Sequence, residues 1–454
     1  MAKKENFFKK YKSIILGILF TLLCLLVWRF ASHIQLPLVD YKTPESGDGS
    51  IFGFLDMFSG GALSSFSIVA LGISPYITAS IVVQLLQMDV IPQFKEWSEE
   101  GEAGKEKLNR WTRYIALFLA FVQGLALIIG YEASYGATYF KYIENAEFNI
   151  FTYIYIALVI TAGTSFVLWL ADQITMKGIG NGSSLLIVAG IVASFPTMIS
   201  AMWKFFITGE YSNYHWNEDN VAGGATTGWG IALFILLLVF FILIIVGVVW
   251  MEGLVRKIPI QYSNRPAAAR LVGNQDSNMP IKLNSASVIP VIFASTLLSL
   301  PMTVINFLQQ NASFNTDWLE MIFSYDKPIG YALYIILIFV FAFFYSFLQI
   351  DPDKVADNLK KNNAYIPGVK PGEATAQFIS KTLFKTTLLG ATYLAVLASL
   401  PIIVSWCFAG VGEGLPSSIQ IGGTSLMIVV GIALETVKQI KTQAQSKEYK
   451  GFLK

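Results

Sequence analysis

The sequence predicts an all-α polytopic membrane protein, with ten transmembrane helices in two inverted five-helix halves. Three observations lead to this fold class: an apolar composition, ten uncharged apolar blocks, and two internal repeats that lie five blocks apart. Of the 454 residues, 54% are hydrophobic and 14% are charged, whereas an ordinary soluble domain has roughly 25% charged residues. A soluble chain of this length would need a more polar surface, so the composition favours a membrane protein.

The apolar residues gather in blocks, and a helix needs about 20 mostly apolar residues to cross a bilayer. The ten blocks are 13–28, 57–88, 114–131, 148–171, 183–203, 221–251, 283–316, 328–350, 386–412 and 414–434. The first block follows a basic stretch, a pattern that is also typical of a signal peptide. Because residues 29–42 contain no small-residue cleavage site, we expect a retained first helix.

The basic residues predict how the spans are oriented. With the N-terminus in the cytoplasm, the two tails and the loops 89–113, 172–182, 251–285 and 351–385 hold 27 of the 32 Lys and Arg residues. The positive-inside rule expects such a bias toward the cytoplasm. An error of one span would put all later loops out of phase, so we expect ten spans with both termini in the cytoplasm.

Two pairs of short segments repeat at a distance of five spans. Residues 181–191 (NGSSLLIVAGI) align with 422–432 (GGTSLMIVVGI) at seven identical positions, and 75–80 (PYITAS) align with 290–295 (PVIFAS). An offset of five spans makes the two copies run in opposite directions, which is an inverted-topology repeat with its sites near the membrane midplane. The expected halves are residues 1–206 and 207–454.

The second apolar block is too long for one simple span and is interrupted. Gly60 and Gly61, and then the run from Gly72 to Pro75, divide it into a short piece at about 59–70 and a fuller helix at about 75–88. Non-helical backbone at membrane depth is tolerated where protein or a water-filled cavity covers it. The break therefore indicates a cavity, and a kinked core helix is the alternative.

Two long loops lie on the predicted cytoplasmic side. Residues 251–285 alternate in short extended runs, which predicts a hairpin-like protrusion. The loop 351–385 begins with Asp351 as a helix N-cap and Pro352 in the first turn, so we expect a short charged helix to about Asn362. A rigid turn should follow at 365–372. A solvated surface is the alternative interpretation of the charges in both loops.

The sequence offers little support for catalysis, and we expect no catalytic residue, no metal site and no cofactor. The two histidines, His33 and His215, lie in predicted external segments, and there is no HExxH, GxSxG or P-loop motif. Asp172, Glu252 and Glu435 lie at the predicted cytoplasmic ends of their helices, where a charge is affordable. Because ion-coupled transporters usually carry an ionisable residue within a span, the absence of a mid-span charge weakens a transporter interpretation.

The two cysteines, Cys24 and Cys407, both lie within apolar blocks. We interpret them as small core residues rather than as a disulfide or a metal pair.

Several motifs, in order along nearly the whole chain, resemble the SecY family of protein-conducting channels. The motifs are 70–80 (ALGISPYITAS), 84–86 (QLL), 100–104 (EGEAG), 173–175 (QIT), 178–182 (GIGNG), 288–295 (VIPVIFAS), 356–361 (ADNLKK), 366–373 (IPGVKPGE) and 422–426 (GGTSL). Each motif alone is modestly specific, but their order from residue 58 to 440 indicates membership of this family. The resemblance implies an hourglass-shaped channel between the two halves.

The resemblance also implies a ring of apolar side chains at the waist of this channel. The matching positions are Ile73, Ile77, Ser183, Ile187, Ile292 and Ile428. Ile77, Ile187, Ile292 and Ile428 all lie in the repeated segments. A narrow apolar constriction excludes ions by dewetting. Ser183 stands where family members usually carry an apolar residue, and packing against lipid or core is the alternative for each isoleucine.

A plug and a lateral gate are further features that the resemblance implies. The plug, a half-helix that closes the external funnel, corresponds to the segment from Ser59 through Gly60, Gly61, Ala62, Leu63, Ser64, Ser65, Phe66, Ser67 and Ile68. The second and seventh spans correspond to the gate through which hydrophobic segments reach lipid. Polar contacts across that gate are expected from Ser80, Gln84, Ser295 and Thr296.

The basic cytoplasmic loops resemble the family's docking surface for the ribosome and for the SecA motor. The candidate docking residues are Arg256, Lys257, Arg265, Arg270 and Lys370, and Lys370 stands where most members carry arginine. The resemblance further implies the small subunits SecE and SecG, nascent chains and signal peptides as partners, within the lipid bilayer of the bacterial plasma membrane. We expect a passive channel that moves unfolded preproteins and releases hydrophobic segments laterally. A secondary transporter with inverted repeats is the first alternative, and an intramembrane enzyme is the second.

Overall fold

The computed structural model describes residues 7–37, 40–41, 56, 58–87, 91–135, 140–141, 150–208, 225–262, 277–311, 317–324, 327–409 and 417–452. Ten helices correspond to the ten apolar blocks: α1 (Phe7–Ala31), α3 (Ser74–Leu86), α5 (Glu102–Tyr135), α6 (Ile150–Lys177), α7 (Gly182–Trp203), α8 (Ala225–Gly253), α9 (Ile289–Asn311), α11 (Pro328–Gln349), α13 (Glu373–Ala409) and α14 (Ser417–Phe452). The helical segments between them are α4 (Pro92–Glu99), η2 (Lys204–Thr208), α10 (Asp317–Phe323) and α12 (Pro352–Lys361). The strands are β1 (Asp40–Tyr41), β2 (Phe140–Lys141), β3 (Val255–Tyr262), β4 (Ser277–Lys282) and β5 (Ala364–Tyr365).

Most of these helices are long enough to cross a bilayer. In the part of the chain that the structure describes, seven are both long and apolar enough to do so: α1, α5, α6, α7, α8, α11 and α13. The helix α3 and the first part of α9 are apolar but shorter, and α14 covers the tenth block. The prediction of a helix at each block is therefore confirmed.

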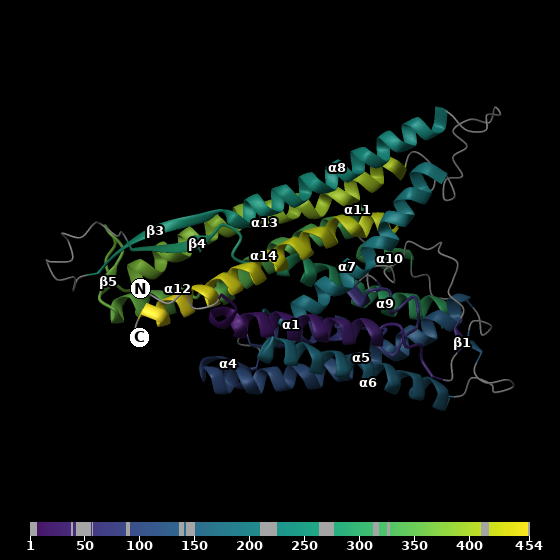
Figure 1. Ribbon diagram of the computed structural model, residues 1–454, viewed down its shortest axis with the longest axis horizontal. Coiled ribbons are helices and arrows are strands. Elements are labelled where there is room, and N and C mark those ends of the chain that lie inside the picture. Colours follow the sequence, from purple (N-terminus) through teal and green to yellow (C-terminus); the bar gives the residue numbers. More distant parts are fainter. Residues whose placement is uncertain are drawn as a thin grey trace.

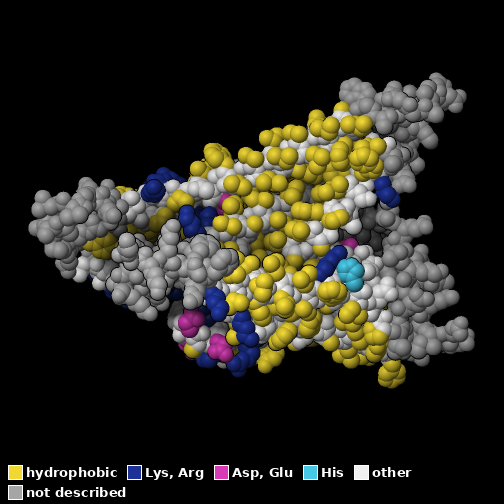
Figure 2. All heavy atoms as spheres, viewed as in Figure 1, with side chains coloured by type: hydrophobic (Ala, Val, Ile, Leu, Met, Phe, Trp, Pro, Cys, Tyr) yellow, Lys and Arg dark blue, Asp and Glu magenta, His cyan; other side chains and the backbone are white. Residues whose placement is uncertain are grey.

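The helices lie side by side along the long axis of the molecule, and the three-stranded sheet β4-β3-β5 lies with α12 at one end (Figure 1). The strand β1, which pairs with β2, lies at the opposite end. A broad hydrophobic surface covers the helices between the two ends, and most of the visible Lys and Arg side chains lie toward the end with the sheet (Figure 2). Leu236, Phe151 and Trp169 are among the exposed apolar side chains, as expected of a surface that lipid covers.

Helix packing brings segments from the two halves of the sequence together. The helix α3 packs on α5 and α9, and α9 in turn packs on α5 and α11. At the other side, α14 packs on α7, α8 and α13 and also contacts α1. The central cluster of buried hydrophobic side chains draws on helices from both halves. The repeated prolines Pro75 and Pro290 lie in the first turns of α3 and α9, as their equivalent positions in the repeat predict.

The predicted interruption of the second block is confirmed, but its short piece is not a half-helix. Residues 58 and 59 are helical, and residues 60–73 form a series of turns before α3 begins. Gly60, Gly61 and Gly72 have φ values of 69°, 83° and 53°, and Phe66 has a φ of 47°. A right-handed helix cannot continue through positive φ angles, so the backbone of these residues excludes the expected helix.

The two loops predicted to be cytoplasmic, 251–285 and 351–385, contain the elements expected from the sequence. Strands β3 and β4 form an antiparallel hairpin, and the Asp351 side chain accepts hydrogen bonds from the backbone of Asp353 and Lys354 at the start of α12. The strand β5, which the sequence did not indicate, pairs with the end of β3. A separate small core of Ile258, Ile281, Ile366, Ile379 and Leu383 joins the hairpin to the turn 365–372 and to α13.

Candidate functional site

Five isoleucines that the sequence places at a channel waist are buried together between helices of both halves. Ile73 and Ile77 lie at the start of α3, Ile187 on α7, Ile292 on α9 and Ile428 on α14. Their side chains are only 1–7% exposed, and all five belong to the central cluster of buried hydrophobic residues. A water-filled passage lined by these side chains would expose them, so no such passage is open beside them in the conformation described.

Ser183, the sixth candidate of the ring, differs from the others. It lies in the first turn of α7, where its hydroxyl donates a hydrogen bond of 2.7 Å to the Asn181 side chain. The same oxygen of Asn181 accepts a bond from the Ser183 backbone and caps the helix. The hydroxyl of Ser183 is thus engaged at the helix cap, and the central hydrophobic cluster contains Ile187, one turn further along α7, instead.

The candidate plug is held by α1 and by the segment that follows α1. Arg29 donates a hydrogen bond of 2.7 Å to the carbonyl oxygen of Gly60. The backbone of Leu36 donates to Phe66, and the backbone of Ile68 donates to the carbonyl oxygen of Ile34. The start of the turn segment is thus bonded to α1, and its end is bonded to the residues that follow α1.

The plug segment also packs closely against the middle of two spans. A side chain at Gly163 of α6 would approach the carbonyl oxygen of Ile68 to 2.0 Å, and one at Gly60 would approach Trp28 to 2.8 Å and the Cα atom of Gly190 of α7 to 3.2 Å. Leu63 and Phe66 are each 1% exposed and belong to a second hydrophobic cluster with residues of α5 and α6. Glycines at these positions therefore allow the plug backbone to approach the helices.

Asp56 organises the start of the plug segment. Its Oδ1 atom accepts a hydrogen bond of 2.8 Å from the backbone of Ser64 and a longer one from the hydroxyl of Ser59. Burial raises the pKa of this carboxyl above its ordinary value, while the bonds from Ser64, Leu63 and Ser59 partly offset that shift. The Oδ1 atom of Asp56 thus accepts the hydrogen bonds that link Asp56 to Ser59 and Ser64.

The candidate gate helices α3 and α9 pack against one another. Among the hydrogen bonds described for the four polar candidates, each stays within its own helix. Gln84 donates to Ser80 at 3.2 Å, and both Ser295 and Thr296 donate to the carbonyl oxygen of Ile292. The Oε1 atom of Gln84 is buried and has no hydrogen-bond partner. The contact between the helices thus depends on apolar packing, and the polar contacts expected across it are not formed in this conformation.

The candidate docking residues fall into two groups. Arg256 and Lys257 on β3 and Lys370 in the turn before α13 are exposed at the end with the sheet, as expected of a docking surface. Arg265 and Arg270 lie outside the described residues. The turn that carries Lys370 is rigid, since Gly368 and Gly372 have positive φ values and the Thr375 hydroxyl donates a bond to the carbonyl oxygen of Lys370.

Sequence reasoning did not identify Arg29 and Asp56, which form hydrogen bonds with the candidate plug segment. Arg29 directly follows the first apolar block, and this single charge at the end of an expected span was the available signal. Asp56 lies shortly before Gly60 and Gly61, near the turn to which its side chain bonds. Glu252 lies at a helix end, where a charge is affordable, and the structure shows that it is buried, with 5% of the residue exposed. Cys24 is buried as predicted, and the side chain of Cys407 lies outside the described part of the chain.

The buried isoleucines, the candidate plug segment and the packed helices α3 and α9 can be compared with known proteins. A model of the SecY family matches residues 67–437 of this chain. The chain belongs to the SecY family. Its relatives include the protein translocase subunits SecY of Bacillus licheniformis, with 43% identity over 100% of both chains, and of Staphylococcus aureus, with 43% identity over 98% of both.

Solved structures agree with the SecY fold and its ten transmembrane helices. A protein-conducting channel covers 96% of this chain and 93% of its own with a TM-score of 0.63 at 17% identity. A structure of Sec61 in a canine ribosome-channel complex covers the same shares with a TM-score of 0.58 at 17% identity. The SecY-family chain described here is thus a multi-pass membrane protein and the protein-conducting channel subunit of the Sec translocon, a transport channel and not an enzyme.

Proposed function

We propose that this SecY-family chain passes unfolded preproteins through a central pore that the five buried isoleucines close at rest. The observation that carries the proposal is that Ile73, Ile77, Ile187, Ile292 and Ile428 come from four helices of both halves and are nearly inaccessible to solvent. Apolar side chains in a narrow passage exclude ions by dewetting and can move apart for a peptide. Ser183 contributes through the cap of α7 rather than through an apolar surface.

The plug segment, residues 59–68, adds a second barrier on the side opposite to the sheet. Its attachment to α1 through Arg29 and Gly60, and its close approach to Gly163 and Gly190, support a seated position at rest. A short segment of turns can leave this position more readily than a membrane-spanning helix. One solved relative is a SecY protein whose plug domain stabilises the closed state and maintains a membrane seal, and we extend this role to the present segment.

Lateral release of hydrophobic segments would use the contact between α3 and α9. These helices carry Ser80, Gln84, Ser295 and Thr296, whose hydrogen bonds stay within each helix. Opening the contact would therefore break apolar packing without leaving new polar groups unpaired. The buried Oε1 atom of Gln84 would even gain access to a partner when the helices separate. The two halves, residues 1–206 and 207–454, would move apart at this contact.

The basic surface at the end with the sheet fits partners that drive transport. Solved relatives include channels bound to ribosomes, and ribosomal RNA is a polyanion that basic residues attract. We assign Arg256, Lys257, Arg265, Arg270 and Lys370 to docking of the ribosome and of the SecA motor. SecE and SecG would complete the complex in the bacterial plasma membrane, with both termini and the sheet on the cytoplasmic side. Nascent chains and signal peptides would be its cargo.

Transport by purified channel in lipid vesicles tests this function. We expect a preprotein to enter the vesicles only when the motor ATPase and ATP are added, and small solutes to stay outside in the absence of cargo. Channel-free vesicles and vesicles without the motor serve as the controls. Uptake of a small solute by the channel alone, driven by an ion gradient, would instead support the secondary transporter.

A further inference from the structure

Glu252 is a buried carboxylate at the junction between the span α8 and the cytoplasmic hairpin. It lies in the last turn of α8, two residues before the chain turns into β3, and is 5% exposed. Burying an ionised carboxylate costs several kcal/mol unless it is paired and hydrogen-bonded. At a helix end, this side chain could instead extend into water. The partners that keep it buried therefore indicate a specific structural role.

The partners of Glu252 come from three other segments. Its Oε1 atom accepts a hydrogen bond of 2.9 Å from Asn284 and one of 3.4 Å from the hydroxyl of Ser287. Lys438 of α14 donates a bond of 3.1 Å to the backbone carbonyl of Glu252. Lys282 at the end of β4 and Lys438 both attract its charge. The cluster thus joins α8, α14, the end of β4 and the turn that leads into α9.

The turn 283–288 has little room to move independently. Its first residue continues the hairpin ladder through a bond from the Leu283 backbone to Leu254, and Asn284 also donates to the carbonyl oxygen of Ser287. A side chain added at Gly390 of α13 would approach Leu283 to 2.9 Å, and one at Gly431 of α14 would approach Val288 to 2.8 Å. The turn is therefore held between α13 and α14, and Glu252 supplies its polar anchor.

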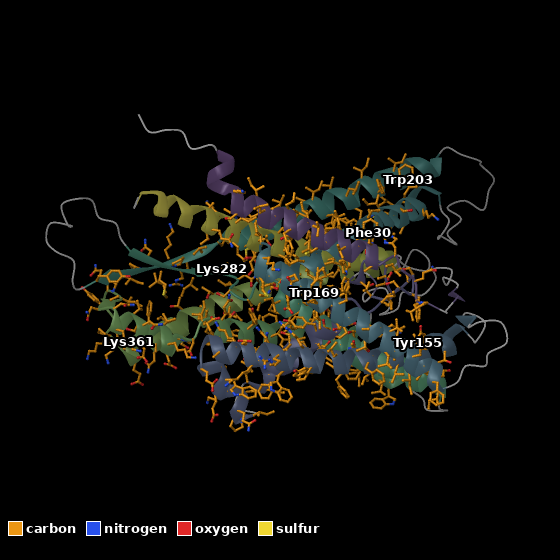
Figure 3. All side chains as sticks on the ribbon, turned by 60° about the horizontal axis from the view of Figure 1, so that its bottom comes forward. Phe30, Tyr155, Trp169, Trp203, Lys282 and Lys361 are labelled. Atoms are coloured by element: carbon orange, nitrogen blue, oxygen red, sulfur yellow. The ribbon has the colours of Figure 1, made fainter. Side chains whose placement is uncertain are left out.

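This turn is the covalent connection between the docking hairpin and the gate helix. Lys282 is the last residue of β4 and lies where this strand meets the helices (Figure 3). The turn 283–288 connects it to Ile289, the first residue of α9. A stiff connection passes a displacement of the hairpin to α9, whereas a loose one absorbs it. Coupling between two sites requires a packed element of this kind, whose position both sites can bias.

We propose that Glu252 is a positioning residue that couples docking at the β3–β4 hairpin to opening of the gate between α3 and α9. The proposal rests on the proposed function, because it needs a docking surface on the hairpin and a gate at α9. The carboxylate acts through Asn284 and Ser287, which it holds in the geometry that makes the turn stiff. The Oε1 atom of Glu252 performs this role, because it accepts hydrogen bonds from the side chains of Asn284 and Ser287.

Paired spin labels at the gate test the coupling directly. The labels are attached to Ser80→Cys and Ser295→Cys in a background without Cys24 and Cys407, and their distance is measured with and without purified ribosomes. In the otherwise unchanged channel, we expect ribosomes to lengthen the distance. In Glu252→Ala, ribosomes should bind within about twofold of normal affinity while the opened population falls about tenfold, within the range of known coupling energies.

Two matched variants separate coupling from folding. Glu252→Gln keeps an acceptor oxygen for Asn284 and Ser287, so it should retain the response. Glu435→Ala removes an exposed carboxylate from the neighbouring helix α14 and should leave the response intact. If Glu252→Ala does not accumulate in the membrane, Asn284→Ser removes the same bridge with a smaller change and should show the same loss.

The outcomes distinguish the coupling from the function on which it rests. A full response in Glu252→Ala or Asn284→Ser would overturn the role of this cluster while leaving the docking surface and the gate in place. A loss of response in Glu252→Gln equal to that in Glu252→Ala would also contradict it, because the acceptor oxygen is retained. No response in the unchanged channel, despite bound ribosomes, would overturn the proposed gate and the coupling together.

Discussion

At the scale of single residues, the proposed constriction requires Ile77 and Ile428 to be both apolar and buried. Replacing either by Asn places an amide where 7% and 1% of the side chain is exposed, which favours water in the constriction. We expect the ion conductance of resting vesicles to rise about tenfold, since about 1.4 kcal/mol taken from a barrier changes a rate by that factor.

Conductance measured across a bilayer containing each variant checks this prediction. Val429→Asn is the control, because it introduces the same polar side chain beside Ile428 at a partly buried position of α14. Vesicles with this variant should conduct fewer ions than vesicles with Ile428→Asn. Normal conductance in both Ile77→Asn and Ile428→Asn would show that these residues do not form the barrier.

Asp56 provides a second prediction at this scale, because its Oδ1 atom holds the plug turn through Ser64 and Ser59. Asp56→Ala removes the acceptor and should weaken the seated plug by about 0.5–1.5 kcal/mol, the net value of a hydrogen bond. Asp56→Asn keeps an acceptor oxygen without a charge and should seat the plug at least as well. Reaction of Leu63→Cys with a thiol reagent, in a background without the native cysteines, measures the exposure of the plug.

The raised pKa of Asp56 also predicts a pH dependence of the seated plug. Burial favours the neutral form of this carboxyl and so raises its pKa above the ordinary value of 3.8. The neutral group therefore stabilises the seated plug fully at pH values below 3.8. This stabilisation is lost as the pH rises through the raised pKa. Resting conductance should therefore increase with pH over this window, and Asp56→Asn should remove the dependence. An unchanged pH profile in Asp56→Asn would contradict the assignment.

At the scale of elements, the contact between α3 and α9 should behave as a movable joint. A disulfide between Ser80→Cys and Ser295→Cys, without Cys24 and Cys407, should stop preprotein transport, and reduction should restore it. The two Cα atoms must come within roughly 4.4–6.8 Å for the bond to form, so adjacent pairs are tried in parallel. Vesicle transport before and after reduction is the measurement, and full transport by the oxidised channel would place the gate elsewhere.

The hairpin and the turn before α13 form one packed unit through the cluster of Ile258, Ile281, Ile366, Ile379 and Leu383. This unit places Lys370 on the same end of the molecule as Arg256 and Lys257, although more than a hundred residues separate them in the chain. The pairing of β5 with β3 strengthens this link. Two loops that are far apart in the sequence thus form one surface, to which we assign docking.

At the scale of the whole molecule, two partners should depend on this surface in different ways. Ribosomal RNA binding should weaken steeply with salt, so Arg265→Glu with Arg270→Glu should lower ribosome affinity and flatten its salt dependence. Docking of a folded motor depends more on shape and on a few central residues, so Lys370→Glu should impair motor-driven export and leave ribosome binding largely intact. Lys370→Arg should be tolerated, since it keeps the charge.

Ribosome affinity over a salt series and motor-driven export, each normalised to the amount of channel in the membrane, measure these effects. If all three charge reversals lowered only the amount of folded channel, the loops would be ordinary solvated surface.

The sequence by itself determined the ten helices, the interruption after Ser59, the hairpin at 251–285 and the capped helix after Asp351, because apolar block length and turn residues act locally. Ring candidates could be named from the repeat and the family motifs. Only the tertiary structure decided that Glu252 is buried and that Arg29 binds Gly60. It also decided that the hydrogen bonds described for Ser80, Gln84, Ser295 and Thr296 stay within their own helices. Burial and partner choice depend on which distant segments pack together, and neither the length nor the pattern of a block contains that information.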